Sequence, residues 1–139
     1  MNNKLILISI LFIATLVFFN FSAYAEDEAV DTYASTLINS CSVRLSDAGT
    51  SLNAAASITA KAKSDQVGFS TLKFQKYTNG SWVTVKTISA IYRYEALSYS
   101  GTFKYTGESG EKYRAVCNFY VRSGTVSESR TFTSDSLTF

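Results

Sequence analysis

The sequence predicts an all-β fold: a two-sheet antiparallel β-sandwich of about seven strands, preceded by an N-terminal signal peptide. Three observations lead to this prediction. From residue 39 onward apolar residues recur with a period of two, Thr, Tyr, Val and Phe are frequent, and turn-forming residues recur at intervals of about ten residues. Many short strands with this pattern inside one domain are typical of a sandwich.

The N-terminus has the order of a secretory signal peptide. Lys4 provides a positive start, residues 5–19 are mostly apolar, and Ala23 and Ala25 lie at positions −3 and −1 of a cleavage point before Glu26. The apolar stretch is shorter than the roughly 20 residues that span a bilayer. We therefore expect cleavage after Ala25, no stable membrane anchor afterwards, and secretion to the extracellular space.

The chain beyond the cleavage point has two parts of different composition, an acidic segment and a strand-forming segment. Glutamates and aspartates crowd its first residues, and the strand pattern begins only after them. We expect three parts: a signal peptide (1–25), an acidic flexible lead-in (26–38) and a β-sandwich domain (39–139).

The first predicted strand covers residues 40–46. Alternation places Cys41, Val43 and Leu45 on one face, and the sequence Asp-Ala-Gly at 47–49 predicts a turn.

Residues 52–63 fit a helix by composition and a strand by pattern. Their alanines favour a helix. Their apolar and polar residues alternate almost strictly, however, and an amphipathic helix would bury Asn53 and Ser57 with the apolar residues. We therefore expect a strand.

The next two strands form a hairpin around Asn79 and Gly80. This dipeptide is typical of a type I′ turn, which needs positive φ at both central residues. With these two residues as the loop, Phe74 is expected opposite Val85 on the more apolar face.

Two further strands are expected at 97–106 and 112–122, separated by a corner from Gly107 to Gly110. In the second of these strands, alternation groups five residues on the inward face: Tyr113, Ala115, Cys117, Phe119 and Val121.

The last strand, 125–132, follows a turn at Ser123 and Gly124. A tight two-residue loop would place Glu128 and Arg130 on the buried face of the preceding strand. We therefore expect a longer loop or a β-bulge.

The chain has two cysteines, Cys41 and Cys117. Export would deliver them to a compartment in which disulfides persist, and both are predicted to point inward. We expect a disulfide between the first and the sixth strand, and the alternative is two buried free thiols.

The segment 110–129 resembles the end of an immunoglobulin-like or fibronectin type III domain. Tyr113 opens the strand, alternating apolar residues follow, and Ser123 and Gly124 lead into a Ser-rich last strand. The hairpin at 79–82 is similar to hairpins of short secreted sandwich proteins of Gram-positive bacteria. Antibody-type domains have Tyr two residues before the second Cys, whereas Tyr113 is four before Cys117. The resemblance implies an architecture and no activity.

The composition argues against an enzyme. With no histidine, the chain has neither Ser-His-Asp nor Cys-His chemistry and lacks the commonest zinc ligand. We expect no cofactor and no metal. Paired carboxylates can hydrolyse glycosides, but the loop carboxylates are expected to be solvated: Asp47, Asp65, Glu108 and Glu111. The net charge of +2 carries no basic stripe, so nucleic acid is not expected as a partner.

The outer face of the hairpin is the candidate ligand patch. Its predicted register places Tyr77 beside Trp82 and Lys73 opposite Lys86. Aromatic rings beside ammonium groups can stack on sugars and hold carboxylates, whereas the alternative role is a cross-strand pair that stabilises the hairpin. A second cluster, for which edge-strand packing is the alternative, comprises Tyr92, Arg93, Tyr94 and Tyr99.

From these residues we expect a secreted, non-catalytic domain that binds a cell-surface or cell-wall component, such as a glycan, or another protein. The alternative is a small secreted bacteriocin-like toxin or an inhibitor. The sequence leaves the oligomeric state open.

Overall fold

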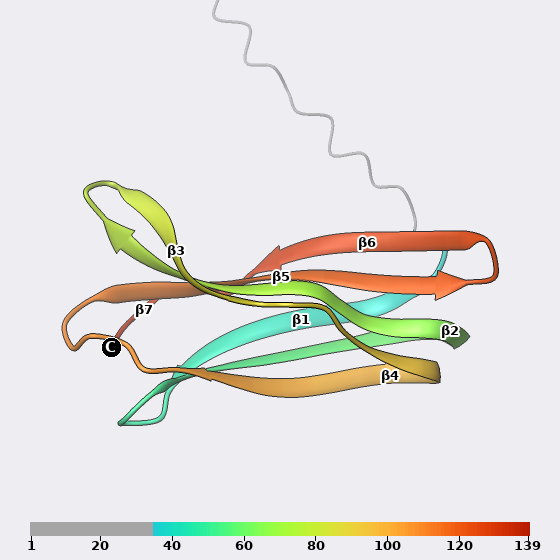
Figure 1. The fold of residues 1–139 in the computed structure, drawn as a ribbon, viewed down its shortest axis with the longest axis horizontal. Coiled ribbons are helices and arrows are strands. Elements are labelled where there is room, and N and C mark those ends of the chain that lie inside the picture. Colours follow the sequence, from blue (N-terminus) through green and yellow to red (C-terminus); the bar gives the residue numbers. More distant parts are fainter. Residues whose placement is uncertain (1–34) are drawn as a thin grey trace, which may run out of the picture. The chain divides into compact units, whose positions relative to one another are not determined.

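A computed structural model describes residues 35–139, which form β-strands joined by turns and contain no helix (Figure 1). The predicted all-β fold is confirmed. All strand pairs are antiparallel. The strands are β1 (Ile38–Asp47), β2 (Leu52–Thr78), β3 (Ser81–Ile88), β4 (Ile91–Tyr105), β5 (Lys112–Ser123), β6 (Val126–Thr133) and β7 (Leu137–Thr138).

Strand β2 organises the fold because each of its halves pairs with different neighbours. Its first half lies between β1 and β4, and its second half lies between β5 on one side and β3 with the start of β4 on the other. The alanine-rich stretch 52–63 is therefore a strand, as its alternation predicts. It continues without interruption into the hairpin strand, so β2 is 27 residues long.

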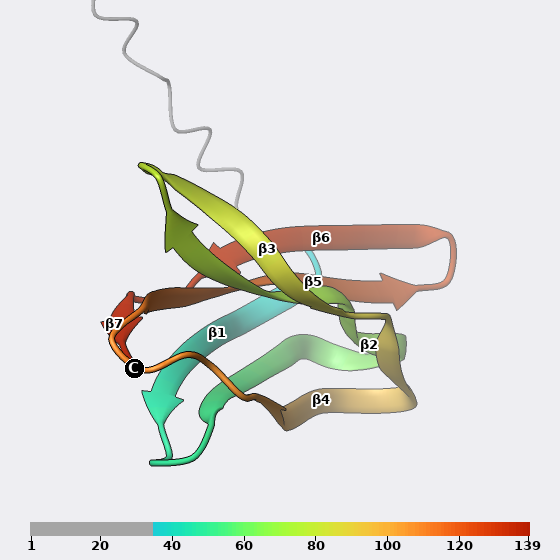
Figure 2. The same cartoon turned by 60° about the vertical axis from the view of Figure 1, so that its left-hand side comes forward.

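Strands β2 and β4 stay paired along both halves of β2, while the other neighbour of β2 changes from β1 to β5 (Figure 2). Their register shifts between Thr59 and Ser64, and Glu95 on β4 has a positive φ of 50°. An exposed ion pair between Lys63 Nζ and Glu95 Oε2, at 3.4 Å, lies at this position. A left-handed conformation is costly for a residue other than glycine. Glu95 thus marks the point at which β4 passes from the second half of β2 to the first.

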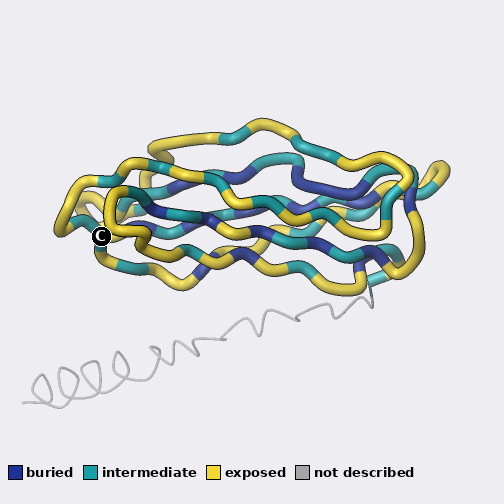
Figure 3. Tube along the Cα trace, turned by 90° about the horizontal axis from the view of Figure 1, so that it is seen from below, coloured by how far each residue is buried: buried dark blue, intermediate teal, exposed yellow. Residues whose placement is uncertain are grey.

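Alternation along the strands builds one hydrophobic core from both halves of β2 (Figure 3). Phe69 lies at its centre: its ring meets those of Tyr99, Phe103 and Phe119 edge to face, with centroids 4.9, 5.8 and 5.5 Å away. Aromatic pairs prefer such edge-to-face geometry. The largest fully buried side chains include Tyr113, Phe69, Phe74, Phe119, Ile38, Leu52, Ile58 and Leu72.

The hairpin of β5 and β6 corrects the prediction of a longer loop or bulge. Ser123 pairs with Val126 across a two-residue loop, and the register runs without a shift to the end of β6. Glu128 therefore lies opposite the buried Val121, and Arg130 lies opposite the buried Phe119. Two charged side chains face inward on an edge strand, an arrangement that also discourages pairing with other chains.

The inward position of Glu128 is tolerated because the start of β1 supplies its hydrogen-bond donors. Its carboxylate accepts a bond from the Ser35 hydroxyl, and bonds from the amides of Leu37 at 2.7 Å and Ile38 at 3.2 Å. Arg130 Nε lies 3.3 Å from the same carboxylate. The sequence pattern could not reveal these donors, because they lie about 90 residues away along the chain.

The predicted disulfide is not formed in this structure, in which Cys41 and Cys117 are free thiols. Their strands do not pair with each other: Cys41 lies opposite Ile58, and Cys117 lies opposite Leu72. Burial, and then the nearby Cys41, raises the pKa of Cys117 to about 12. Such a thiol stays protonated at neutral pH, and the protonated form is a poor nucleophile for disulfide formation.

Candidate functional site

The tip of the β2–β3 hairpin has the predicted turn. Asn79 and Gly80 have φ values of 51° and 81°, and Thr78 pairs with Ser81 across them. Both central residues therefore have the positive φ that a type I′ turn requires. This turn fixes the register of the residues next to it.

Tyr77 and Trp82 lie directly opposite each other, as predicted. Their ring centroids are 5.1 Å apart at an interplanar angle of 58°. Tyr77 is 42% exposed, whereas Trp82 is half-buried. Their side chains alternate with the buried ones of Leu72 and Phe74, so the pair belongs to the outer face of the sheet.

Arg114 on β5 is part of the same cluster, and the sequence reasoning missed it. Its guanidinium carbon lies 4.4 Å from the centroid of the Trp82 ring, and its Nε donates a hydrogen bond of 2.8 Å to Gln75 Oε1. A cation over an indole face is an attractive contact. Alternation places Arg114 on an outward position, but only the pairing of β5 with β2 brings it to the hairpin.

Of the two predicted lysines, Lys73 lies on the outer face and Lys86 does not. Lys73 is opposite Thr87 and Val116. The register shifts after Gln75, so that Lys86 faces the buried Phe74. Its Nζ donates a 2.7 Å hydrogen bond to the carbonyl oxygen of Lys104.

This bulge corrects two details of the predicted hairpin. Phe74 is opposite Lys86 instead of Val85, and Lys73 is opposite Thr87 instead of Lys86. One extra residue on β3 reverses the face on which the following side chains lie. The patch therefore consists of Lys73, Gln75, Tyr77, Trp82 and Arg114, which we call the aromatic–cation patch.

The second predicted cluster is divided between two faces. Arg93 and Tyr99 pack together, with the guanidinium carbon 5.6 Å from the ring centroid, and Tyr99 contacts the core through Phe69. Tyr92 instead meets Tyr120 of β5, with ring centroids 5.5 Å apart.

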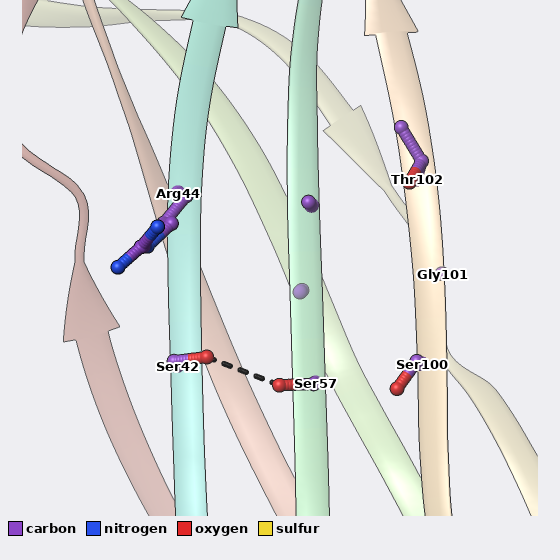
Figure 4. A pocket seen from close by; sticks show the side chains of 8 residues that line it. Ser42, Arg44, Ser57, Ser100, Gly101 and Thr102 are labelled. Carbon is purple, nitrogen blue, oxygen red and sulfur yellow. Dashed lines mark hydrogen bonds between the residues drawn. The ribbon is translucent and has the colours of Figure 1, made fainter.

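The other outer face, formed by β1, the first half of β2 and β4, has a shallow hollow of about 430 Å³ (Figure 4). Small side chains line it, and the hydroxyl oxygens of Ser42 and Ser57 are 3.0 Å apart. Arg44 provides the only charge among its lining residues. Figure 4 shows that Arg44 points away from Ser100 and Thr102. Hydroxyl groups without a neighbouring base supply no activated nucleophile.

The loop carboxylates have structural partners. Lys76 Nζ lies 2.6 Å from Glu108 Oε2 and 3.5 Å from Glu111 Oε1. The hydrogen bond from Lys76 to Glu108 is the main cause that raises the pKa of Lys76. Asp47 accepts a bond from the amide of Gly49 at 2.6 Å, and Asp65 accepts one from Gly124 at 2.7 Å.

Within residues 35–139, no group of three or more His, Cys, Asp or Glu side chains is placed to hold a metal ion. The same part of the chain has no helix long and apolar enough to cross a membrane. The predicted signal-cleavage residues Ala23, Ala25 and Glu26 lie outside the described residues. No family model, curated protein or solved structure matches the chain.

Proposed function

We propose that the chain is a secreted, non-catalytic binding domain that attaches to a glycan of a cell wall or cell surface. In this proposal the signal peptide ends at Ala25, and the domain is an immunoglobulin-like two-sheet sandwich. The aromatic–cation patch is its binding surface.

The strand order supports the sandwich architecture. Strands β1, β2 and β4 are neighbours in the order of strands A, B and E of immunoglobulin-type domains, and β2, β5 and β6 follow the order of strands C, F and G. The buried Tyr113 also fits, because its hydroxyl oxygen accepts a 2.9 Å hydrogen bond from the amide of Glu108. Such domains have a tyrosine at this corner that bonds to the backbone a few residues upstream.

The arrangement of Tyr77, Trp82 and Arg114 is the observation that carries the binding proposal. A tyrosine ring that is 42% exposed stands beside an indole whose other neighbour is a guanidinium group. An exposed ring offers a flat apolar surface to a sugar, and a guanidinium group binds carboxylates in a planar, two-bond geometry. Cross-strand pairing by itself accounts for Tyr77 and Trp82, but it does not account for the cation.

Retention on purified bacterial cell-wall sacculi tests this function. The residues 26–139 are mixed with sacculi and sedimented, and the bound fraction is measured. We expect Tyr77→Ala and Arg114→Ala each to weaken retention by about tenfold, the effect typical of an important interface residue. Val83→Ala is the matched control, because Val83 belongs to the same hairpin, is 49% exposed and lies opposite Lys76 on the other face. Circular dichroism verifies that each variant is folded.

Two results would overturn the proposal. One is that the Tyr77 and Arg114 variants are retained on the sacculi as strongly as the wild type. The other is no retention at all together with growth inhibition of related strains by the purified protein, which would favour a toxin. Expression of the full chain with N-terminal sequencing of the secreted product tests export separately, and the expected first residue is Glu26.

A further inference from the structure

A second aromatic group lies at the far end of the sheet that carries the aromatic–cation patch. Tyr92 of β4 and Tyr120 of β5 are both opposite Gly68, on its two sides. Their rings meet across this glycine with centroids 5.5 Å apart. Tyr94, two residues further along β4, is 69% exposed.

Gly68 makes this aromatic pair possible. A Cβ atom at this position would lie 2.1 Å from the carbonyl oxygen of Ile91 and 2.9 Å from Cα of Tyr92. Only glycine therefore allows β4 to approach β2 this closely. The closely paired strands bring the two tyrosine rings together over the glycine, which has no side chain of its own.

The two aromatic groups share one outer face. On β5 the buried residues Ala115, Cys117 and Phe119 alternate with four outward residues. These outward residues run from one aromatic group to the other: Arg114, Val116, Asn118 and Tyr120. Arg114 and Tyr120 are six residues apart, which corresponds to about 20 Å at the rise of an antiparallel strand.

The electrostatics of this face favour an anionic ligand. Lys73, Arg114 and Arg122 have outward positions, and none of them forms an ion pair within residues 35–139. Strands β3 and β5 and residues 66–78 of β2 contain no Asp or Glu. The single acidic residue of β6, Glu128, faces inward, and its carboxylate accepts a hydrogen bond from the amide of Leu37 just before β1.

The surface between the aromatic groups is polar but mostly uncharged. Thr71, Asn118 and Thr131 form one row across β2, β5 and β6. Thr87, Lys73 and Thr133 belong to the next row. The hydroxyl groups of these threonines can exchange hydrogen bonds with the hydroxyls of sugars. Arg114 and Arg122 are eight residues apart on β5, which corresponds to about 27 Å at the strand rise. Three cations spread over this length suit a ligand with occasional carboxylates better than one with a phosphate on every unit.

We infer that this face binds an extended acidic polysaccharide along β5, with one end on the aromatic–cation patch and the other on Tyr92 and Tyr94. This inference rests on the proposed function and specifies its ligand as a linear, carboxylate-bearing glycan chain. A short oligosaccharide reaches only one aromatic group, whereas a longer one contacts both.

Calorimetric titration with hyaluronan oligosaccharides tests the inference, because these are linear chains with a carboxylate on every second sugar. We compare an acidic dimer with an acidic octamer to test the length of the site. We compare the acidic octamer with a neutral glucan octamer to test the contribution of the carboxylates. The wild type should bind the acidic octamer at least tenfold more tightly than the dimer or the neutral chain. The double variant Tyr92→Ser with Tyr94→Ala should lose this length dependence and retain binding of the dimer. Val83→Ala should behave as the wild type.

The outcomes separate the two proposals. If the octamer binds the Tyr92 and Tyr94 variant as tightly as the wild type while Tyr77→Ala abolishes binding, the extended site is wrong and the proposed function stands. If Tyr77→Ala also has no effect, both are wrong. Tighter binding of a single-stranded oligonucleotide than of the acidic octamer would overturn the choice of a glycan. Thermal unfolding of the double variant verifies that its fold is intact.

Discussion

The carboxylate of Glu128 accepts a 2.7 Å hydrogen bond from the main-chain amide of Leu37, across 91 positions of the sequence. This bond joins the inward face of the last long strand to the beginning of the first strand. Burial acts to raise the pKa of Glu128, but bonds from Ser35, Leu37 and Ile38, together with the charge of Arg130, outweigh it and lower the pKa to about 2.

We therefore expect Glu128→Gln to destabilise the fold by about 1.5–3 kcal/mol at neutral pH, the range for hydrogen bonds to a charged group. The lowered pKa means that the stabilisation is complete above the ordinary value of 4.5 and disappears as the pH falls toward 2. Urea unfolding at pH values between these two should show that the free energy of unfolding of the wild type falls as the pH is lowered. The same change in pH should lower the free energy of unfolding of the variant less. Glu111→Gln, which removes an exposed partner of Lys76, is the control. Equal pH profiles for the wild type and Glu128→Gln would contradict this account.

The two cysteines should react as free thiols of unequal access. Burial is the largest cause that raises the pKa of both, and Cys41 is half-buried whereas Cys117 is fully buried. A maleimide should therefore modify Cys41 slowly in the native protein and reach Cys117 only after unfolding. Mass spectrometry of the native and the denatured protein measures this. A protein that takes no label when denatured without reductant would instead contain a disulfide.

Gly68→Ala should be strongly destabilising, because its Cβ would overlap the backbone of Ile91. Strand β4 would have to move away from β2, so we expect a loss of more than about 3 kcal/mol or failure to fold. Gly101→Ala is the matched control on β4. Its Cβ would meet the Phe103 side chain at 3.0 Å, and a side chain can shift. Thermal unfolding compares the two, and equal effects would contradict the steric argument.

Phe69→Ala should remove the centre of the core. The ring of Phe69 is 1% exposed and contacts three other aromatic rings, so truncation should cost about 3–5 kcal/mol. Phe132→Ala, at a ring that is 41% exposed, should cost less than about 1.5 kcal/mol. Chemical denaturation gives both free energies of unfolding. A similar cost for the two variants would mean that Phe69 is not central to the core.

Alternation along the chain predicted the class of fold and the inward residues of β5 correctly. It decided between helix and strand at 52–63, because a period of two places apolar residues on one face only in a strand. It did not predict that β2 would run unbroken through both halves of the sheet, since no local signal distinguishes a bend from a turn. It also did not predict the free state of Cys41 and Cys117.

The candidate patch was predicted in part. Turn chemistry fixed Tyr77 opposite Trp82, because Asn79 and Gly80 define the nearest register. The bulge a few residues further on removed Lys86 from this face, and sequence pattern gives no sign of it. Arg114 entered the patch because β5 pairs with β2, a contact between segments about 40 residues apart.

Periodicity and turn residues determined by themselves the all-β class, most of the strands and the inward side chains of β1 and β5, because these properties depend on neighbours along the chain. The tertiary structure alone decided which strands lie together, which cations stand beside Trp82, and how an inward carboxylate finds its donors. Those outcomes depend on hydrogen bonds and packing between distant segments, whose free energies no local pattern contains.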